Sequence, residues 1–300
     1  MKISIIQQIP KYSELYRNER YPDIHALRTK ADESINECLE MISQAADDGA
    51  DLAVTIETVN AFLALGDTRY NYPDVYGGVN GNDVQMFSNA AKKHKIYIVA
   101  GLLVTIEQKT YNCAVLFDKN GDIAGIHKKV HLPAGEELTV APGDKFEVFD
   151  TDFGRIGMLV CWDMQYPEAA RELALAGADL IACPTLGWEN IYGLSRAYEN
   201  SVTIAAAMAT CRGGLSDIVD PSCIVNNMGK IVAVAPRDRE CVITAEIDIN
   251  QEPLPQYSSQ KFYPSNSMRK TRFVQRRPDT YRLASMPLDQ TPLYKRYFKN

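Results

Sequence analysis

The sequence predicts a layered α/β sandwich in a single domain. Strand–helix–strand units recur along the chain, with short apolar runs between segments of helical periodicity. Between these units lie pairs of strand-like segments joined by turn signals such as Asp118-Lys119-Asn120-Gly121, which are typical of antiparallel hairpins. No shift in composition marks a boundary and no internal repeat is present, so the 300 residues are expected to form one domain.

The first strand–helix–strand unit is expected within residues 2–56. Residues 2–7 have the alternating pattern of a short strand. From about residue 24 to 48, apolar residues recur at spacings of three and four, and Gly49 is a typical helix terminator. The apolar run 52–56 then predicts a buried strand.

The remaining elements follow the same two patterns. They are expected as helix 82–94, strands 96–106, 111–117, 123–130, 146–149 and 156–160, helix 167–177, strand 179–185, helix 193–201, strand 202–208, hairpin strands 223–225 and 230–234, and strand 242–249. From about residue 250 to 300 the chain is rich in Pro, Arg and Tyr and lacks periodicity. We expect this segment to be an ordered C-terminal arm.

Composition favours a soluble globular protein over several other classes. The chain is 46% hydrophobic and 23% charged, which suffices for a sizeable core. Its net charge of -6 argues against a nucleic-acid surface. We find neither a signal peptide nor an apolar run that could span a membrane. The seven cysteines are scattered without a CxxC pair, which predicts a reducing cytoplasm rather than a disulfide framework or a zinc site.

Three apolar strands are each followed by a residue that can act as a nucleophile, a base or a cation. Cys161 lies where a buried strand gives way to a helix that begins near Pro167, a place where α/β proteins often bind ligands. Glu57 and Lys129 come at the ends of two other strands. A thiol needs a base to become a nucleophile and a cation to hold the oxyanion that it generates. These three residues therefore form a candidate site.

Simpler explanations exist for each residue alone. A cysteine is often inert core packing, a glutamate after a strand can be an exposed loop residue, and a lysine can be a solvated edge charge. A Cys–His dyad with His131 is a further alternative. The sequence has no Gly-x-Ser-x-Gly elbow, and Gly77-Gly78-Val79-Asn80-Gly81 lacks the Lys-Ser/Thr of a phosphate loop.

Three segments centred on these residues form motifs in a fixed order. They are Ala50-Asp51-Leu52-Ala53-Val54-Thr55-Ile56-Glu57, His127-Lys128-Lys129-Val130-His131-Leu132, and Cys161-Trp162-Asp163 continued by Tyr166-Pro167-Glu168-Ala169-Ala170-Arg171-Glu172-Leu173. With these motifs the chain resembles the nitrilase superfamily of carbon–nitrogen hydrolases over nearly its whole length. It departs from the family at Ile56, where Pro is common, and at His127-Lys128, where the family has Tyr-Arg.

The resemblance implies a four-layer α-β-β-α sandwich and a catalytic triad of Glu57, Lys129 and Cys161. Glu57 would be the general base and Cys161 the nucleophile. Lys129 and the backbone N–H of Trp162 would hold the oxyanion of the tetrahedral intermediate.

Family members often carry a second glutamate after the lysine motif, which positions the substrate or the lysine. Glu136 fits this place best, and the adjacent Glu137 is the alternative. The resemblance also implies that no metal or organic cofactor is needed. It further implies a homodimer or higher homo-oligomer, with the arm after about residue 250 at a subunit interface.

The residues after the cysteine indicate a substrate class. Trp162-Asp163 resembles the amidase and N-carbamoyl amidohydrolase branches, whereas nitrile-cleaving branches more often have Trp-Glu. We therefore expect a thiol hydrolase that releases ammonia from a small carboxamide or N-carbamoyl (ureido) compound. A nitrilase is the first alternative. A non-catalytic binding protein on the same fold is an alternative of another class, although such a protein need not retain the triad.

Two loops are expected to line the substrate pocket. The segments 58–76 and 186–192 contain aromatic side chains that could form its walls, namely Phe62, Trp188 and Tyr192. The polar segment 8–21 lies outside the motifs and could close over the site.

Overall fold

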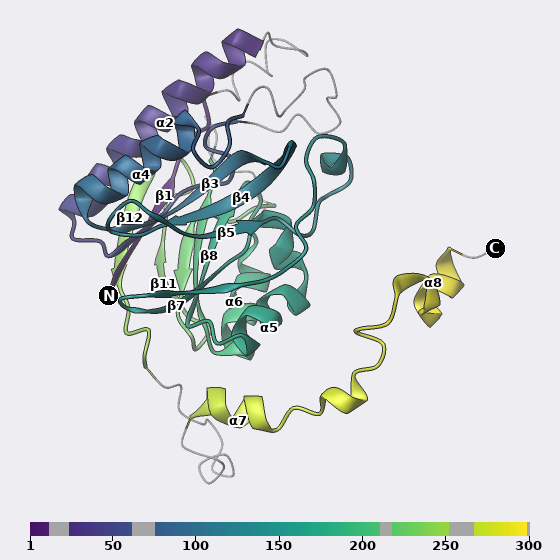
Figure 1. Cartoon of the computed structure of the whole chain (residues 1–300). Helices are drawn as coiled ribbons and strands as arrows, with labels where there is room; N and C mark the ends of the chain where they lie inside the picture. Colours follow the sequence, from purple (N-terminus) through teal and green to yellow (C-terminus); the bar gives the residue numbers. More distant parts are fainter. Residues whose placement is uncertain (12–23, 62–75, 211–217, 252–266, 299–300) are drawn as a thin grey trace. The chain divides into compact units, whose positions relative to one another are not determined.

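Two six-stranded sheets lie face to face in residues 1–251 of the computed structural model (Figure 1). The strand orders are β12-β1-β2-β3-β4-β5 and β11-β10-β9-β8-β7-β6. The structure describes residues 1–11, 24–61, 76–210, 218–251 and 267–298. The chain divides into two units, Met1–Gln251 and Glu252–Asn300, and each is described by itself.

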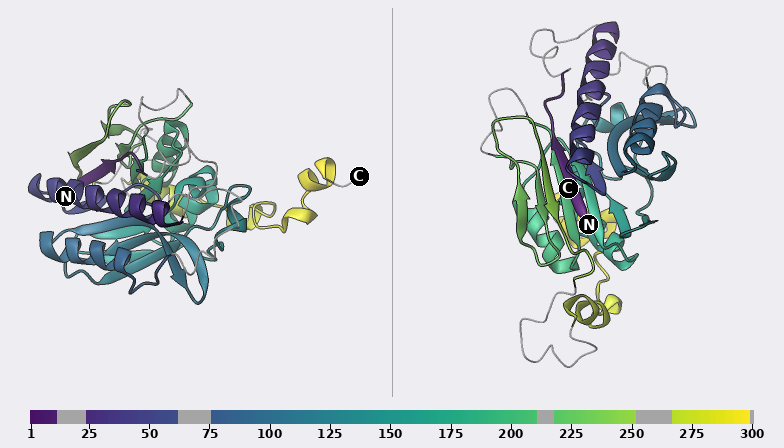
Figure 2. Two further views of the ribbon diagram at one scale, coloured as in Figure 1. Left: turned by 90° about the horizontal axis from the view of Figure 1, so that it is seen from above. Right: turned by 90° about the vertical axis from the view of Figure 1, so that its left-hand side faces the viewer.

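The first sheet contains β1 (Lys2–Gln7), β2 (Leu52–Val54), β3 (Tyr97–Ile106), β4 (Lys109–Phe117), β5 (Ile123–Lys128) and β12 (Cys241–Glu246). The second sheet contains β6 (Val148–Thr151), β7 (Gly154–Met158), β8 (Leu180–Thr185), β9 (Thr203–Met208), β10 (Cys223–Val225) and β11 (Ile231–Val234). Helices α2 (Ile24–Asp47) and α4 (Asn82–His94) pack on the first sheet, and α5 (Pro167–Leu175) and α6 (Asn190–Asn200) on the second. Figure 2 shows α2 and α4 together along one face of the sheets.

Side chains of the inner strands alternate between two hydrophobic cores. On β1, Ile3 and Ile5 point into the core between the sheets, whereas Ile6 packs under α2 and α4. On β8, Ala182 lies between the sheets and Cys183 faces α5 and α6. Because both faces of these strands are covered, their sequences are continuous apolar runs. The predicted α/β class and the four-layer α-β-β-α sandwich are confirmed.

Some strands are shorter than the sequence predicts. β2 ends at Val54, not at residue 56, and β7 ends at Met158, not at residue 160. After β2 the chain leaves the regular ladder because the N–H of Gly101 on β3 donates to the Thr55 Oγ1 side chain, 3.0 Å away. Glu57 and Cys161 therefore lie on turns beyond the strand ends, where their side chains can point into a site.

Gly101 allows β3 to pass close to the Glu57 turn. A Cβ atom at this position would lie 2.3 Å from the carbonyl oxygen of Ile56 and 2.8 Å from the Cα atom of Glu57. Both distances are far below normal contact, so a larger residue would displace the turn. The absence of a side chain at Gly101 thus fixes where Glu57 sits.

The second unit contains short helices that the sequence analysis did not predict. They are α7 (Met268–Val274), two 3₁₀ turns at Pro278–Thr280 and Leu288–Gln290, and α8 (Pro292–Tyr297). Their start signals are local caps rather than periodicity: Ser267 Oγ accepts from the Lys270 N–H, and Thr291 Oγ1 from the Tyr294 N–H, each at 3.2 Å. The packing of this arm at a subunit interface stays a prediction.

No helix in the described part of the chain is both long and apolar enough to cross a membrane. Six cysteines fall within the described residues, and all six are free thiols. The cytoplasmic location stays a prediction.

Candidate active site

Four buried side chains, which come from β4 and from the segments after β2 and β5, form a closed hydrogen-bonded ring. Lys129 Nζ donates to Glu57 Oε1 at 2.9 Å and to Glu136 Oε2 at 2.8 Å. Asn112 Nδ2 donates to Glu57 Oε1 at 2.7 Å and to Glu136 Oε1 at 2.9 Å. All four are at most 2% exposed. The structure thus brings Glu136, and not the exposed Glu137, to Lys129.

The ring holds two carboxylates and one ammonium. Burial disfavours the charge of Lys129, but the attraction of Glu57 and Glu136 outweighs it, so the pKa of Lys129 is raised. Burial raises the pKa of Glu136, and Lys129 opposes that shift. Among the described residues, no cluster of three or more His, Cys, Asp or Glu could hold a metal ion. The cation between these carboxylates is the lysine itself.

Cys161 begins a short 3₁₀ helix, Cys161–Gln165, directly after β7. Its φ of 45° is left-handed, an uncommon and strained conformation for a residue with a side chain. The half-buried thiol contacts the Thr185 side chain and the backbone N–H of Leu186. The same Leu186 N–H donates to Glu57 Oε2 at 2.9 Å. Thiol and carboxylate therefore meet at one backbone group.

Cys161 is a thiol rather than a thiolate at neutral pH. Burial raises its pKa to about 12, the charge of Glu57 adds to the shift, and Lys129 opposes it. A thiol with this pKa is a weak nucleophile until a base removes its proton. The arrangement therefore supplies a nucleophile, an adjacent carboxylate base and a buried cation.

The sequence matches the model of the carbon–nitrogen hydrolase family over residues 22–252. The chain belongs to this family. A probable nitrilase of Schizosaccharomyces pombe is 27% identical over 296 residues, covering 95% of this chain and 98% of the relative. The omega-amidase NIT2-B of Xenopus laevis is 30% identical over 236 residues, covering 72% of this chain and 83% of the relative. The crystal structure of a carbon–nitrogen hydrolase from Helicobacter pylori G27 has a TM-score of 0.74 at 24% identity, covering 96% of this chain and 98% of that one.

The membership in this family confirms the resemblance that the three motifs indicate. The roles of individual residues in this carbon–nitrogen hydrolase, however, depend on the geometry of its own site. Trp162 follows Cys161 on the 3₁₀ helix and is 38% exposed. Its backbone N–H belongs to the first turn, where such groups lack intrahelical partners. Its contribution to an oxyanion hole stays a prediction.

Asp163 joins the cysteine turn of this hydrolase to its lysine loop, a role that the sequence analysis did not assign. Its fully buried carboxylate accepts from His127 Nε2 at 2.9 Å and from His131 Nδ1 at 3.0 Å. It also accepts from the backbone N–H groups of Val130, His131 and Val160 at 3.2, 2.9 and 3.2 Å. Burial opposes its charge, but the hydrogen bonds from His127 and His131 lower its pKa.

Asp163→Asn is expected to reduce the free energy of unfolding by about 3 kcal/mol near neutral pH, since an amide N–H₂ would face N–H donors. The pKa of Asp163 is lowered in the folded state from its ordinary value of 3.8. Asp163 therefore stabilises the fold fully at pH values above 3.8, and this contribution is lost as the pH falls below 3.8 toward the folded-state pKa. The free energies of unfolding of the wild type and of Asp163→Asn, measured in urea, should therefore differ by about 1 kcal/mol less near pH 3 than near pH 7.

Asp118→Asn is a suitable control for this measurement, because Asp118 accepts backbone N–H groups in an exposed turn. We expect it to change the free energy of unfolding by less than about 1 kcal/mol. An Asp163→Asn protein as stable as the control would contradict the role of Asp163.

The structure places His131 beside Asp163 and Trp188 in the core of the second sheet. The contacts of His131 are with Asp163 and with the ring of Tyr166, which stacks on it at 3.9 Å, so the geometry does not support a Cys–His dyad. Trp188 is fully buried in the core of the second sheet, where it packs edge-on against Tyr192 at 5.2 Å. The contacts of Trp188 in the described part of the chain give no support for a role in substrate binding. Phe62 and most of segment 8–21 lie outside the described residues.

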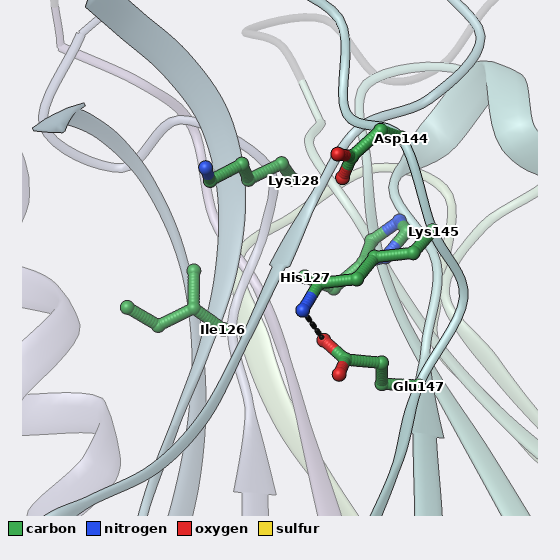
Figure 3. A pocket seen from close by; sticks show the side chains of 6 residues that line it. All are labelled: Ile126, His127, Lys128, Asp144, Lys145 and Glu147. Carbon is green, nitrogen blue, oxygen red and sulfur yellow. Dashed lines mark ion pairs between the residues drawn. The ribbon is translucent and has the colours of Figure 1, made fainter. Parts of the chain in front are cut away.

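A small pocket lies beside β5, and Figure 3 shows the side chains around it. An ion pair joins Lys145 Nζ to Glu147 Oε2 at 2.8 Å on one of its walls. The six lining residues are Ile126, His127, Lys128, Asp144, Lys145 and Glu147. Glu57, Lys129 and Cys161 are not among them, so this pocket is not assigned as the substrate site.

Proposed function

We propose that this carbon–nitrogen hydrolase cleaves a small carboxamide or N-carbamoyl compound, with Glu57, Lys129 and Cys161 as its catalytic residues. The observation that carries the proposal is the buried pair of Glu57 and Lys129, joined at 2.9 Å, with the Cys161 thiol near enough for both charges to act on it. A general base must lie within hydrogen-bonding reach of the proton that it removes, directly or through one water.

In the first half of the reaction, Glu57 takes the thiol proton as Cys161 Sγ bonds to the carbonyl carbon. The carbonyl oxygen becomes an oxyanion, which Lys129 Nζ and the N–H of Trp162 stabilise. Glu57 then gives its proton to the substrate nitrogen, the C–N bond breaks, and ammonia leaves. The product on the enzyme is a Cys161 thioester.

In the second half, Glu57 removes a proton from water as the water oxygen attacks the thioester carbon. Collapse of the new oxyanion breaks the C–S bond, and Glu57 returns the proton to the Cys161 sulfur. The acid leaves and the free enzyme is restored. Glu136 has no proton to transfer in this scheme; its hydrogen bond keeps Lys129 in place.

A nitrilase is the second candidate, favoured by the relative in S. pombe that is described as a probable nitrilase. The X. laevis relative, described as an omega-amidase, favours the amide substrate. The same thiol could attack either a nitrile or an amide carbon. A non-catalytic binding protein is disfavoured because the glutamate, lysine and cysteine are all present and close together.

Ammonia release from a panel of carboxamides, N-carbamoyl amines and nitriles tests the substrate class. We expect turnover of a carboxamide or N-carbamoyl compound to exceed that of any nitrile. Cys161→Ala should lower the rate by about 10⁴-fold or more, because no other group can form the thioester. Activity that survives this substitution would contradict the mechanism. A higher rate on a nitrile than on its amide would favour the nitrilase.

We further propose that the enzyme works as a homo-oligomer in the cytoplasm. Exposed aromatic residues support the first part, since Trp162, Tyr166 and Tyr198 are each 38–40% exposed. Sedimentation at several concentrations measures the assembly state.

A further inference from the structure

The two carboxylate oxygens of Glu57 differ in their hydrogen bonds. Oε1 accepts from both Lys129 Nζ and Asn112 Nδ2, at 2.9 and 2.7 Å. Oε2 accepts from the Leu186 N–H alone among the described residues, at 2.9 Å. A carboxylate oxygen has about two lone-pair directions. Oε1 is therefore saturated, and Oε2 has one direction left.

The hydrogen bonds of the Asn112 side chain come from its amide N–H₂ group. The side chain is fully buried on β4, and its two N–H donors reach one oxygen of Glu57 and one of Glu136. Its Oδ1 atom is buried without a hydrogen-bond partner in the described part of the chain. An unpaired buried acceptor is unfavourable for the folded state, so the fold retains Asn112 despite this loss. The reverse orientation of the amide would point its oxygen at two carboxylates and is excluded by repulsion.

We propose that Asn112 is a positioning residue that, together with Lys129, occupies Oε1 of Glu57 and so makes Oε2 the atom that takes the Cys161 proton. The inference rests on the proposed function. Oε2 is also the oxygen next to the nucleophile, because the Leu186 N–H that it binds contacts the thiol. Proton transfer then forms the O–H bond at Oε2 as the S–H bond breaks, and no N–H donor has to leave.

Without Asn112, the carboxylate of Glu57 would have a free lone pair on each oxygen. It could rotate, or take a proton on the oxygen that lies beside Lys129 instead of the one beside the thiol. The second carboxylate, Glu136, would also lose a donor, although its hydrogen bond to Lys129 would remain. Loss of Asn112 should therefore lower kcat, because it disturbs the proton transfer, whereas substrate affinity should change little.

Asn112→Leu tests this inference, because leucine has a similar size and no donor. We expect kcat to fall by about 100-fold with KM within about threefold, since the loss affects a proton transfer rather than binding. The acid limb of kcat/KM should move upward by about one pH unit, because a carboxylate that loses an N–H donor holds its proton more tightly. Asn112→Gln, which retains the amide, should recover part of kcat.

Asn200→Leu is the matched control. Asn200 is also a buried asparagine with an unpartnered Oδ1, but its amide donates to the Arg196 carbonyl within α6 at 2.9 Å. We expect this variant to lose stability while its pH profile stays unchanged. If Asn112→Leu does not fold, Asn112→Ala, which also lacks a side-chain donor, provides the same measurement of the acid limb.

An Asn112→Leu or Asn112→Ala enzyme with the kcat and acid limb of Asn200→Leu would overturn the inference. That outcome is distinct from failure of the proposed function, in which the Cys161→Ala enzyme would retain activity. A loss of stability alone, with kcat and the pH profile unchanged, would likewise show that Asn112 is merely structural.

Discussion

Lys129→Met is expected to lower kcat/KM by about 10³-fold or more, because the oxyanion loses its cation. The free energy of unfolding should fall by about 3–5 kcal/mol, since Glu57 and Glu136 would be left buried without a counter-charge. Methionine matches the length of the lysine stem, so lost packing contributes little to either effect. Ammonia release and urea unfolding measure the two effects on the same protein.

The pH dependence of stability gives a second measure of Lys129. Burial opposes its charge, but the neighbouring carboxylates raise its pKa above the ordinary value of 10.5. A group whose pKa is raised by folding stabilises the protein fully below its unfolded pKa and loses that contribution as the pH rises toward the folded value. The difference between wild type and Lys129→Met should therefore be constant near neutral pH and shrink only above about pH 10.

Lys128→Met is the control for Lys129→Met. Lys128 is the adjacent residue, but its Nζ atom lies over the ring of Tyr111 at 4.2 Å and does not reach the carboxylates. Its replacement should change the free energy of unfolding by less than about 1 kcal/mol and leave kcat/KM within about twofold. Equal behaviour of the two variants would refute the assignment of Lys129.

Glu57→Gln is expected to separate activity from stability. The rate should fall by about 10³–10⁴-fold, because the amide cannot accept the thiol proton. The free energy of unfolding should change by only about 1 kcal/mol. The glutamine oxygen can still accept from Lys129 and Asn112, and removal of one buried negative charge offsets the lost hydrogen bond from Leu186.

Glu137→Gln controls for the loss of a carboxylate near the site, since Glu137 is exposed and accepts only from the Gly135 N–H among the described residues. Its activity should match the wild type. A Glu57→Gln enzyme with more than about a tenth of the wild-type rate would mean that another group removes the thiol proton.

The sequence was sufficient to predict the fold class and the family. Continuous apolar runs such as 156–160 identify strands that are covered on both faces. The motifs around Glu57, Lys129 and Cys161 then identify the family, which the match over residues 22–252 confirms. The ends of the strands were less well predicted, because hydrogen bonds such as Gly101 N–H to Thr55 Oγ1 depend on tertiary contacts.

Asn112 and Asp163 were missed because their contacts are with residues far away in the chain. Asn112 looks like an ordinary polar residue within a strand, and its partner Glu57 is 55 positions away. Asp163 was quoted within a motif, yet its partners His127 and His131 lie 36 and 32 positions away. Spacing along the chain reports local structure and does not report such pairs.

Trp188, a loop aromatic that we expect at the substrate pocket, packs in the core of the second sheet. The reason is Gly193, which lies on the facing turn of α6. A Cβ atom there would be 2.2 Å from the indole ring, so the missing side chain makes the space that Trp188 fills.

The central claim is that Cys161 carries the substrate's acyl group during turnover. The most direct measurement is mass spectrometry of the enzyme quenched in acid while it turns over an amide from the panel, followed by digestion to locate the added mass. We expect the acyl group on the peptide that contains Cys161, and no adduct on the Cys161→Ala protein. Turnover with the added mass on another residue would contradict it.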